Sequence, residues 1–128
     1  MTQPIIFSIV ESASHPQASD FYTHIGLKEY KFNGMRKALG KLKTVQPQFV
    51  VAEFFYGWGN NYAGVNVSNL DTLLSSLQRY APDAKVIVLV SKREHEHVAK
   101  LEKLFPLHAV LVHPTTPNML GEALQKEG

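Results

Sequence analysis

Five short apolar runs alternate with segments of helical period, and this order constrains the fold more than any other feature of the chain. The runs occupy residues 5–10, 28–32, 49–55, 85–90 and 109–112. Between them, apolar residues recur three and four positions apart, which is the spacing of one buried helix face. Strands that alternate with helices are typical of a parallel sheet covered on both faces. We therefore predict an α/β fold with a doubly wound, parallel, five-stranded sheet.

Composition separates the strands from one another. Run 49–55 is apolar except for Glu53, which predicts a central strand, whereas run 28–32 alternates charged and aromatic residues, which predicts an edge strand. We expect the first helix to start after Ser14 and to end at Gly26, with an apolar face of Phe21, Tyr22 and Ile25.

The remaining helices follow from their apolar spacing and their boundary residues. One lies between residues 34 and 47, and another follows a cap at Ser68 or Asn69 and ends before Pro82. The next carries apolar residues at four positions, Val98, Leu101, Leu104 and Phe105. Thr116 is predicted to cap the last helix, which Pro117 begins.

The length of 128 residues fits one domain, 1–128, able to bury roughly two-thirds of its unfolded surface. The absence of cysteine excludes disulfides and thiolate metal sites. No apolar segment approaches the roughly 18 residues of a membrane span, so we expect a soluble, cytoplasmic protein. The net charge of +2 is spread along the chain, so neither a nucleic-acid partner nor a membrane partner is expected.

Polar residues stand where several predicted strands end. Pro114 favours an extended His113 at the tip of the last strand, and Glu11 and Ser12 follow the first. Glu53 is the lone carboxylate of the central strand. Ligands of open parallel α/β sheets collect at the carboxyl ends of the strands, so these residues form the candidate site.

With these elements the whole chain resembles the receiver domains of two-component response regulators, which have a flavodoxin-like (βα)5 fold. Residues 47–54 are similar to the third-strand segment of that family, with Glu53 in place of the phospho-accepting aspartate. Residues 85–91 resemble the fourth strand, with Val90 where the family has a hydroxyl and Ser91 one position further.

The last strand and the first complete the resemblance. Residues 112–117 resemble the Lys-Pro turn of the family, with His113 in place of the lysine and Pro114 retained. At the end of the first strand the family has two acids that hold magnesium, and this chain has Glu11 and Ser12. Receiver phosphorylation requires the carboxylate nucleophile, the magnesium ion and the lysine. We therefore predict a degenerate pseudo-receiver that is not an enzyme and holds neither metal nor cofactor.

Three roles are open for Glu53 and His113, which we expect at neighbouring strand tips, close enough for a charge-assisted hydrogen bond. They satisfy each other or water as a structural pair, they form a pH-sensitive or ligand-binding pair, or they act as a catalytic acid–base pair. For the helical segment His95–His97 we predict a solvated first turn rather than a metal site, because residues two apart point to different sides of a helix.

The segment 56–67 is long and rich in glycine, and it matches no phosphate-binding motif. Tyr56, Trp58 and Tyr62 are of the types enriched at interface hot spots, so they are candidates for partner binding. The alternative is a glycine-rich connection whose aromatic side chains pack on the domain. Arg36, Lys37, Lys41 and Lys43 are predicted to form a solubilising face.

Our leading hypothesis is a phosphorylation-independent regulatory module that binds proteins. The resemblance implies a partner surface within Ser91–Lys126, and we expect a homodimer. The alternative is a small-molecule or nucleotide binder that uses the strand-tip crevice among Glu11, Glu53, Ser91, His113 and the aromatic segment. A third hypothesis is a small enzyme in which Glu53 and His113 exchange a proton.

Overall fold

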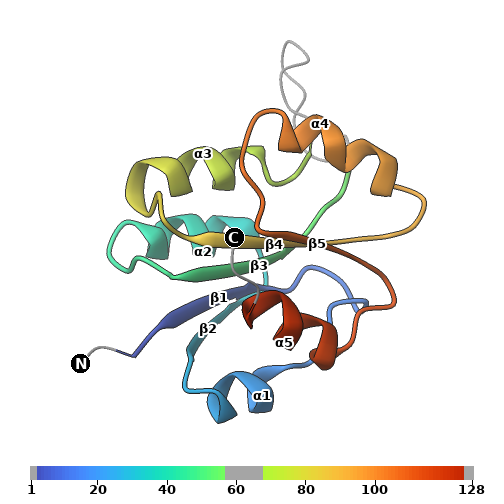
Figure 1. Ribbon diagram of the computed structural model, residues 1–128. Coiled ribbons are helices and arrows are strands. Elements are labelled where there is room, and N and C mark those ends of the chain that lie inside the picture. Colours follow the sequence, from blue (N-terminus) through green and yellow to red (C-terminus); the bar gives the residue numbers. More distant parts are fainter. Residues whose placement is uncertain (1–2, 57–67, 126–128) are drawn as a thin grey trace.

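A computed structural model of the chain describes residues 3–56 and 68–125. Its centre is a sheet of five parallel strands in the order β2-β1-β3-β4-β5 (Figure 1). The strands are β1 (Ile5–Ile9), β2 (Lys28–Phe32), β3 (Phe49–Glu53), β4 (Lys85–Val90) and β5 (Ala109–Val112). The predicted doubly wound, flavodoxin-like α/β sheet is confirmed, with β3 at its centre and β2 at one edge.

Helices cover both faces of this sheet. They are α1 (Ser19–His24), α2 (Met35–Leu42), α3 (Asp71–Tyr80), α4 (Val98–Glu102) and α5 (Pro117–Gln125), and the 3-10 turn η2 (His95–His97) leads into α4. In Figure 1, α2, α3 and α4 lie on one side of the sheet, and α1 and α5 lie on the other.

The alternation of side chains along the strands divides the core into two layers. Neighbouring residues such as Val50 and Val51 are both fully buried but point to opposite faces. Val50 packs in the layer under α2, α3 and α4, and Val51 packs in the layer under α1 and α5. This double coverage explains why the central runs are continuously apolar.

Two predicted core residues lie at the surface instead. Ile25 is 37% exposed because α1 ends at His24, and Gly26, with a φ of 88°, turns the chain away. Leu104 is 55% exposed because α4 ends at Glu102, so the helical spacing no longer places this side chain against the sheet.

Three predicted boundaries are also corrected. β1 ends one residue earlier than expected, at Ile9, and α1 begins at Ser19 rather than after Ser14. β3 ends at Glu53, and two residues later the backbone N–H of Phe55 donates to the side chain of Asn69.

The last helix is built as its sequence indicates. Thr116 Oγ1 accepts a hydrogen bond from the Met119 N–H at 3.3 Å, so the predicted cap is confirmed. Gly121 faces α1, where a Cβ atom would lie 2.6 Å from the Phe21 ring. A side chain at this position would therefore have to displace the Phe21 ring. In the two described segments, no helix has the length and hydrophobicity needed to cross a membrane.

Candidate functional site

The parallel arrangement brings the carboxyl ends of all five strands to one edge of the sheet. Glu53 is the last residue of β3 and lies opposite Leu89 of β4. On the other side of β3, Ile9 of β1 pairs with Ala52, so Glu11 and Ser12 leave β1 beside the Glu53 side chain.

The Glu53 carboxylate is 1% exposed and accepts three hydrogen bonds from the segment that follows β1. Its Oε2 accepts from the backbone N–H of Glu11 at 2.7 Å and from that of Ser12 at 3.0 Å. Its Oε1 accepts from the Ser12 hydroxyl. A buried carboxylate is tolerated when donors of this kind replace its hydration shell. Glu53 therefore anchors the β1–α1 loop to the centre of the sheet.

Asn69 completes this arrangement, and sequence reasoning missed its role. Its Nδ2 donates to Glu11 Oε1 at 3.0 Å and to the Glu53 carbonyl oxygen at 2.8 Å. Its Oδ1 accepts the Phe55 N–H at 2.8 Å. An asparagine just before an apolar helical stripe is typical of a helix N-cap. The sequence therefore did not indicate that Asn69 joins Glu11 to the end of β3.

The capping prediction for the same segment is wrong, because Leu70 occupies the N-cap position of α3 and no side-chain hydrogen bond caps this helix. Ser68 Oγ accepts the Leu70 N–H at 3.1 Å, while Asp71 Oδ1 accepts from both the backbone N–H and the hydroxyl of Ser68. Asn69 makes no hydrogen bond from its side chain to the start of α3. Its amide is thereby free to join the ends of β1 and β3.

Glu11 contributes a second carboxyl group to the site. Burial raises the pKa of this carboxyl above its ordinary value of 4.5, the hydrogen bond from Asn69 opposes that change, and the nearby charge of Glu53 adds to it. The charged form of Glu11 therefore costs folding stability as the pH rises above 4.5, and this cost is complete once the pH exceeds the raised pKa.

The receiver resemblance implies a magnesium ion at this place, and the residues present do not suit one. Magnesium requires several carboxylate or water oxygens in octahedral geometry. Both oxygens of Glu53 accept hydrogen bonds from the β1–α1 loop, and Ser12 replaces the second acid. Across the residues that the structure describes, no group of three or more His, Cys, Asp and Glu side chains is arranged to hold a metal ion.

The expected pairing of Glu53 with His113 is wrong. The two residues end β3 and β5, and β4 lies between these strands, so the tips are not neighbours. His113 is half-buried, its N–H donates to the Val90 carbonyl at 2.8 Å, and its Nδ1 lies 3.2 Å from Thr115 Oγ1. The peptide bond from His113 to Pro114 is cis.

The tip of β4 carries no hydroxyl toward Glu53. Val90, which the resemblance placed where the family has a hydroxyl, is buried and aligns with Val112 of β5. Ser91 follows, and its Oγ accepts the Glu94 N–H at 3.3 Å, which closes the turn into η2. Ser91 and His113 therefore bond locally, while Glu11, Ser12, Glu53 and Asn69 form one connected cluster.

A buried histidine that the sequence did not single out lies next to this cluster. His15 is 7% exposed, its Nδ1 lies 2.9 Å from the Pro16 carbonyl oxygen, and its Nε2 has no hydrogen-bond partner within the described residues. Burial lowers the pKa of His15 below its ordinary value of 6.5, although the Pro16 carbonyl and the charge of Glu53 oppose this change.

His15 should make folding stability depend on pH. Because its pKa is lower in the folded chain, the unfolded chain binds the proton more tightly, and stability is lost as the pH falls from 6.5 through the folded pKa. We expect His15→Asn to lose less stability than the wild type between pH 6.5 and about pH 5, measured by urea unfolding. Parallel pH profiles for the two proteins would contradict this expectation, and Glu11 contributes equally to both.

Tyr56 lies at the end of the first described segment, and Trp58 and Tyr62 lie outside the described residues. The Tyr56 ring is 40% exposed and stacks on His97, with ring centroids 3.7 Å apart. Its hydroxyl accepts a hydrogen bond from Lys100 Nζ at 2.9 Å. Of the predicted solvated turn, His95 and Glu96 are exposed, but His97 is half-buried because Tyr56 covers it.

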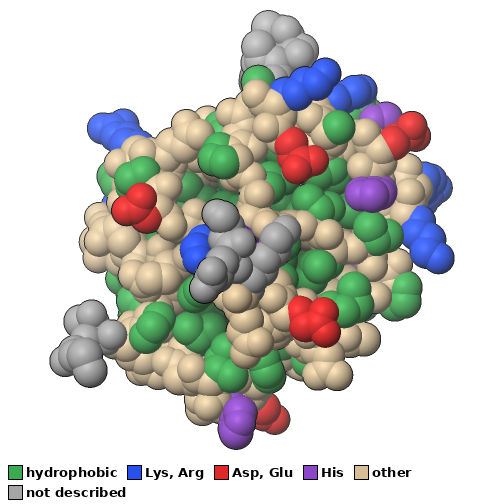
Figure 2. Space-filling model, viewed as in Figure 1, with side chains coloured by type: hydrophobic (Ala, Val, Ile, Leu, Met, Phe, Trp, Pro, Cys, Tyr) green, Lys and Arg blue, Asp and Glu red, His purple; other side chains and the backbone are tan. Residues whose placement is uncertain are grey.

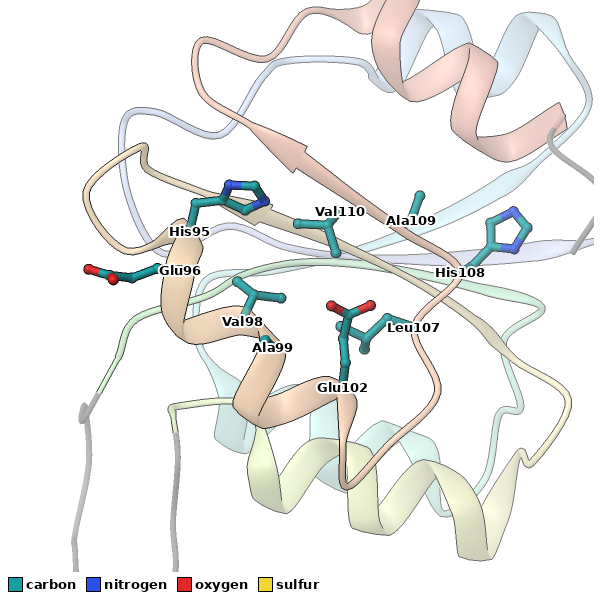
Figure 3. Close-up of a pocket in the computed structure, with 9 residues that line it drawn as sticks. All are labelled: His95, Glu96, Val98, Ala99, Glu102, Leu107, His108, Ala109 and Val110. Atoms are coloured by element: carbon teal, nitrogen blue, oxygen red, sulfur yellow. The ribbon is translucent and has the colours of Figure 1, made fainter.

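Two cavities lined by described residues flank β5. One of about 450 Å³ lies between α4 and β5, where His95 and Glu102 extend toward Val110 and Glu96 points away (Figure 3). A second of about 450 Å³ lies between β5 and α5 and includes Met119. In Figure 2 green hydrophobic side chains are visible between the charged residues over α4 and the region of α5.

No protein-family model matches the chain, and no curated protein matches it significantly. Solved structures do match. A response regulator receiver domain from Clostridium thermocellum is 17% identical, with a TM-score of 0.69 over 94% of this chain and 90% of that one. A chemotaxis response regulator of Vibrio cholerae is also 17% identical, with a TM-score of 0.70 over 97% of this chain and 98% of that one.

A third match was solved in a phosphorylated form. It is a response regulator from Burkholderia pseudomallei with a phosphorylated aspartic acid and a calcium ion, 19% identical, with a TM-score of 0.64 over 96% of this chain and 67% of that one. Identities this low carry the fold and not the chemistry. The chain therefore has the fold of CheY-like response regulator receiver domains.

Proposed function

We propose that this protein is a regulatory module that acts through protein contacts, without phosphorylation and without catalysis. The observation that carries the proposal is the state of the Glu53 carboxylate, which is 1% exposed and accepts three hydrogen bonds from Glu11 and Ser12. A carboxylate acts as a nucleophile only when a lone pair can reach the phosphoryl donor. Here the protein itself occupies both oxygens.

The surroundings of Glu53 support the same proposal. The receiver reaction neutralises the phosphoryl group with a magnesium ion and a lysine ammonium. In their place stand the half-buried carboxyl of Glu11, whose pKa burial raises, and the imidazole of His113, which bonds to Thr115 and not to Glu53. The Glu53 carboxylate already joins β3 to the β1–α1 loop, so we assign this site a structural role.

Incubation with acetyl phosphate or beryllofluoride and magnesium should leave the protein unmodified. Phosphorylation at Oε1 would displace the Ser12 hydroxyl, and phosphorylation at Oε2 would displace the backbone N–H groups of Glu11 and Ser12. Intact mass and the backbone amide spectrum measure the outcome, and an authentic receiver domain treated in parallel serves as the positive control. A magnesium-dependent acyl phosphate on Glu53 would overturn the proposal.

The partner surface of the proposal is formed by α4, β5 and α5, within the range 91–126 that the resemblance implies. β5 is an edge strand whose four residues are all half-buried, and a cavity of about 450 Å³ lies on each side of it. Leu104, two residues after the end of α4, is 55% exposed. Exposed apolar area of this kind is a feature of protein interfaces.

In the absence of another partner we expect a second copy of the chain to cover this face, since a two-fold axis brings the same patch of two copies together. Sedimentation at about 50 µM should therefore show a dimer, and Ala109→Glu, which places a charge between the two cavities, should make it monomeric. Thr72→Glu, at an exposed position of α3, adds the same charge away from β5 and should leave the dimer intact. A monomer at about 200 µM wild-type protein would exclude the homodimer.

A further inference from the structure

The edge of the sheet opposite β5 carries a strong local positive charge. Residues 28–43, which form β2 and α2, contain six Lys or Arg residues and a single acid, Glu29, so this segment has a net charge of +5. The whole chain has a net charge of +2, so the remaining residues together carry −3. We call the six side chains the β2–α2 basic face: Lys28, Lys31, Arg36, Lys37, Lys41 and Lys43.

Contacts fix part of this face in place. The ammonium groups of Lys28 and Lys41 each lie 5.3 Å from the centre of the Tyr30 ring, one from the strand and one from the helix. The Tyr30 ring rests in turn against Phe7 of the core, with centroids 5.8 Å apart. Lys37 is one helical turn before Lys41, so it lies on the same side of α2. Two cations are thus held against one ring, and Lys37 adds a third on the same side of α2.

No described carboxylate pairs with the cations of this face. All six side chains are exposed, and within the described residues none of them forms an ion pair with a carboxylate. Like charges one helical turn apart repel each other, so the arrangement of Lys37 and Lys41 opposes folding. Concentrated charge of one sign attracts ligands of the opposite sign and raises their rate of association.

We propose that the β2–α2 basic face binds an acidic segment of a partner protein. The charge of +5 is confined to one edge of a chain whose overall charge is +2, so it is complementary to a short run of carboxylates. Among the described residues β2 pairs with β1 alone, so an extended segment can approach the lysines along the outer edge of β2.

Tyr30 argues for a protein rather than a single-stranded nucleic acid. Single strands bind by stacking their bases on exposed aromatic rings beside a basic groove. Tyr30 is half-buried, and its ring is engaged by two ammonium groups and by Phe7. The face thus offers cations without a stacking platform. It lies on the far edge of the sheet from β5, so the proposal does not depend on which protein covers β5.

Titration with a fluorescent decaglutamate peptide at low salt tests the proposal on the full chain. We expect saturable binding that weakens as salt is added, and a loss of about tenfold or more in affinity for the double variant Lys37→Glu/Lys41→Glu. The matched control is Arg79→Glu/Lys85→Glu, which changes the net charge equally at exposed positions of α3 and β4 and should lose less than about threefold.

Three outcomes would overturn the proposal. The first is no binding by the wild type, which would leave the face as a solubilising surface. The second is an equal loss in both double variants, which would indicate attraction by overall charge. The third is tighter binding of oligothymidylate, or of vesicles containing phosphatidylserine, than of the peptide, which would assign the face to another class of ligand. The neutral double variant Lys37→Gln/Lys41→Gln is titrated with the same peptide, and its thermal unfolding is measured. Weaker binding by a variant that unfolds at the wild-type temperature shows that the lost charge, and not a lost fold, weakens binding.

Discussion

Replacement of Glu53 by alanine should lower the free energy of unfolding by about 3 kcal/mol. The variant removes an acceptor from two backbone N–H groups and a hydroxyl of the β1–α1 loop, and it opens space at the end of the central strand. A donor left without a partner in the interior loses its bond to water as well as its bond to the protein. Urea unfolding monitored by circular dichroism measures the change.

Two further variants determine what the carboxylate contributes. Glu53→Gln should lose only about 1 kcal/mol, because the amide oxygen can accept the two N–H groups while the amide nitrogen donates to the Ser12 hydroxyl. Glu102→Ala, at an exposed carboxylate of α4, should change stability by less than about 0.5 kcal/mol. If Glu53→Ala equalled or exceeded the wild type in stability, the cost of burying the charge would outweigh its hydrogen bonds, and Glu53 would not be a structural anchor.

Replacement of Asn69 should have the second largest effect, because one side chain joins three elements of the site. Asn69→Ala removes the hydrogen bonds that Asn69 makes to the Phe55 N–H and the Glu53 carbonyl and should cost about 2 kcal/mol. The same variant removes the hydrogen bond that opposes the rise in the Glu11 pKa, so that pKa should rise further. Unfolding in urea measures the first effect, and an NMR titration of the Glu11 carboxyl carbon measures the second.

Asn69→Asp distinguishes geometry from charge at the same position. Its Oδ1 can still accept the Phe55 N–H, but a carboxylate would then face Glu11 Oε1 and the Glu53 carbonyl oxygen, which Asn69 Nδ2 now bonds. We expect a larger loss than for Asn69→Ala at neutral pH and partial recovery at low pH, where the carboxyls are protonated. A variant as stable as the wild type at pH 7 would mean that Asn69 does not bridge the carboxyl groups.

The sequence was sufficient to predict the fold, because residues that are buried in strands and helices recur as apolar residues with a regular spacing along the chain. Continuous apolar runs marked the strands with helices on both faces, and the charged and aromatic alternation of 28–32 marked β2 as an edge. The capping pattern of Thr116 and Pro117 marked the start of α5. Glu53 stood out for the same reason, since a carboxylate inside a buried strand requires donors. Each of these features depends on residues close together in the chain.

Only the tertiary structure decided which donors Glu53 would find. Strand order in a parallel sheet depends on how the crossover helices pack, and the order observed here places β4 between Glu53 and His113. Asn69 lies 58 positions from Glu11 and 16 from Glu53, yet it bonds to both, and its local signal was that of a helix cap. Hydrogen bonds between polar side chains distant in sequence leave no periodic pattern, because any donor that the packed elements bring within reach can make them.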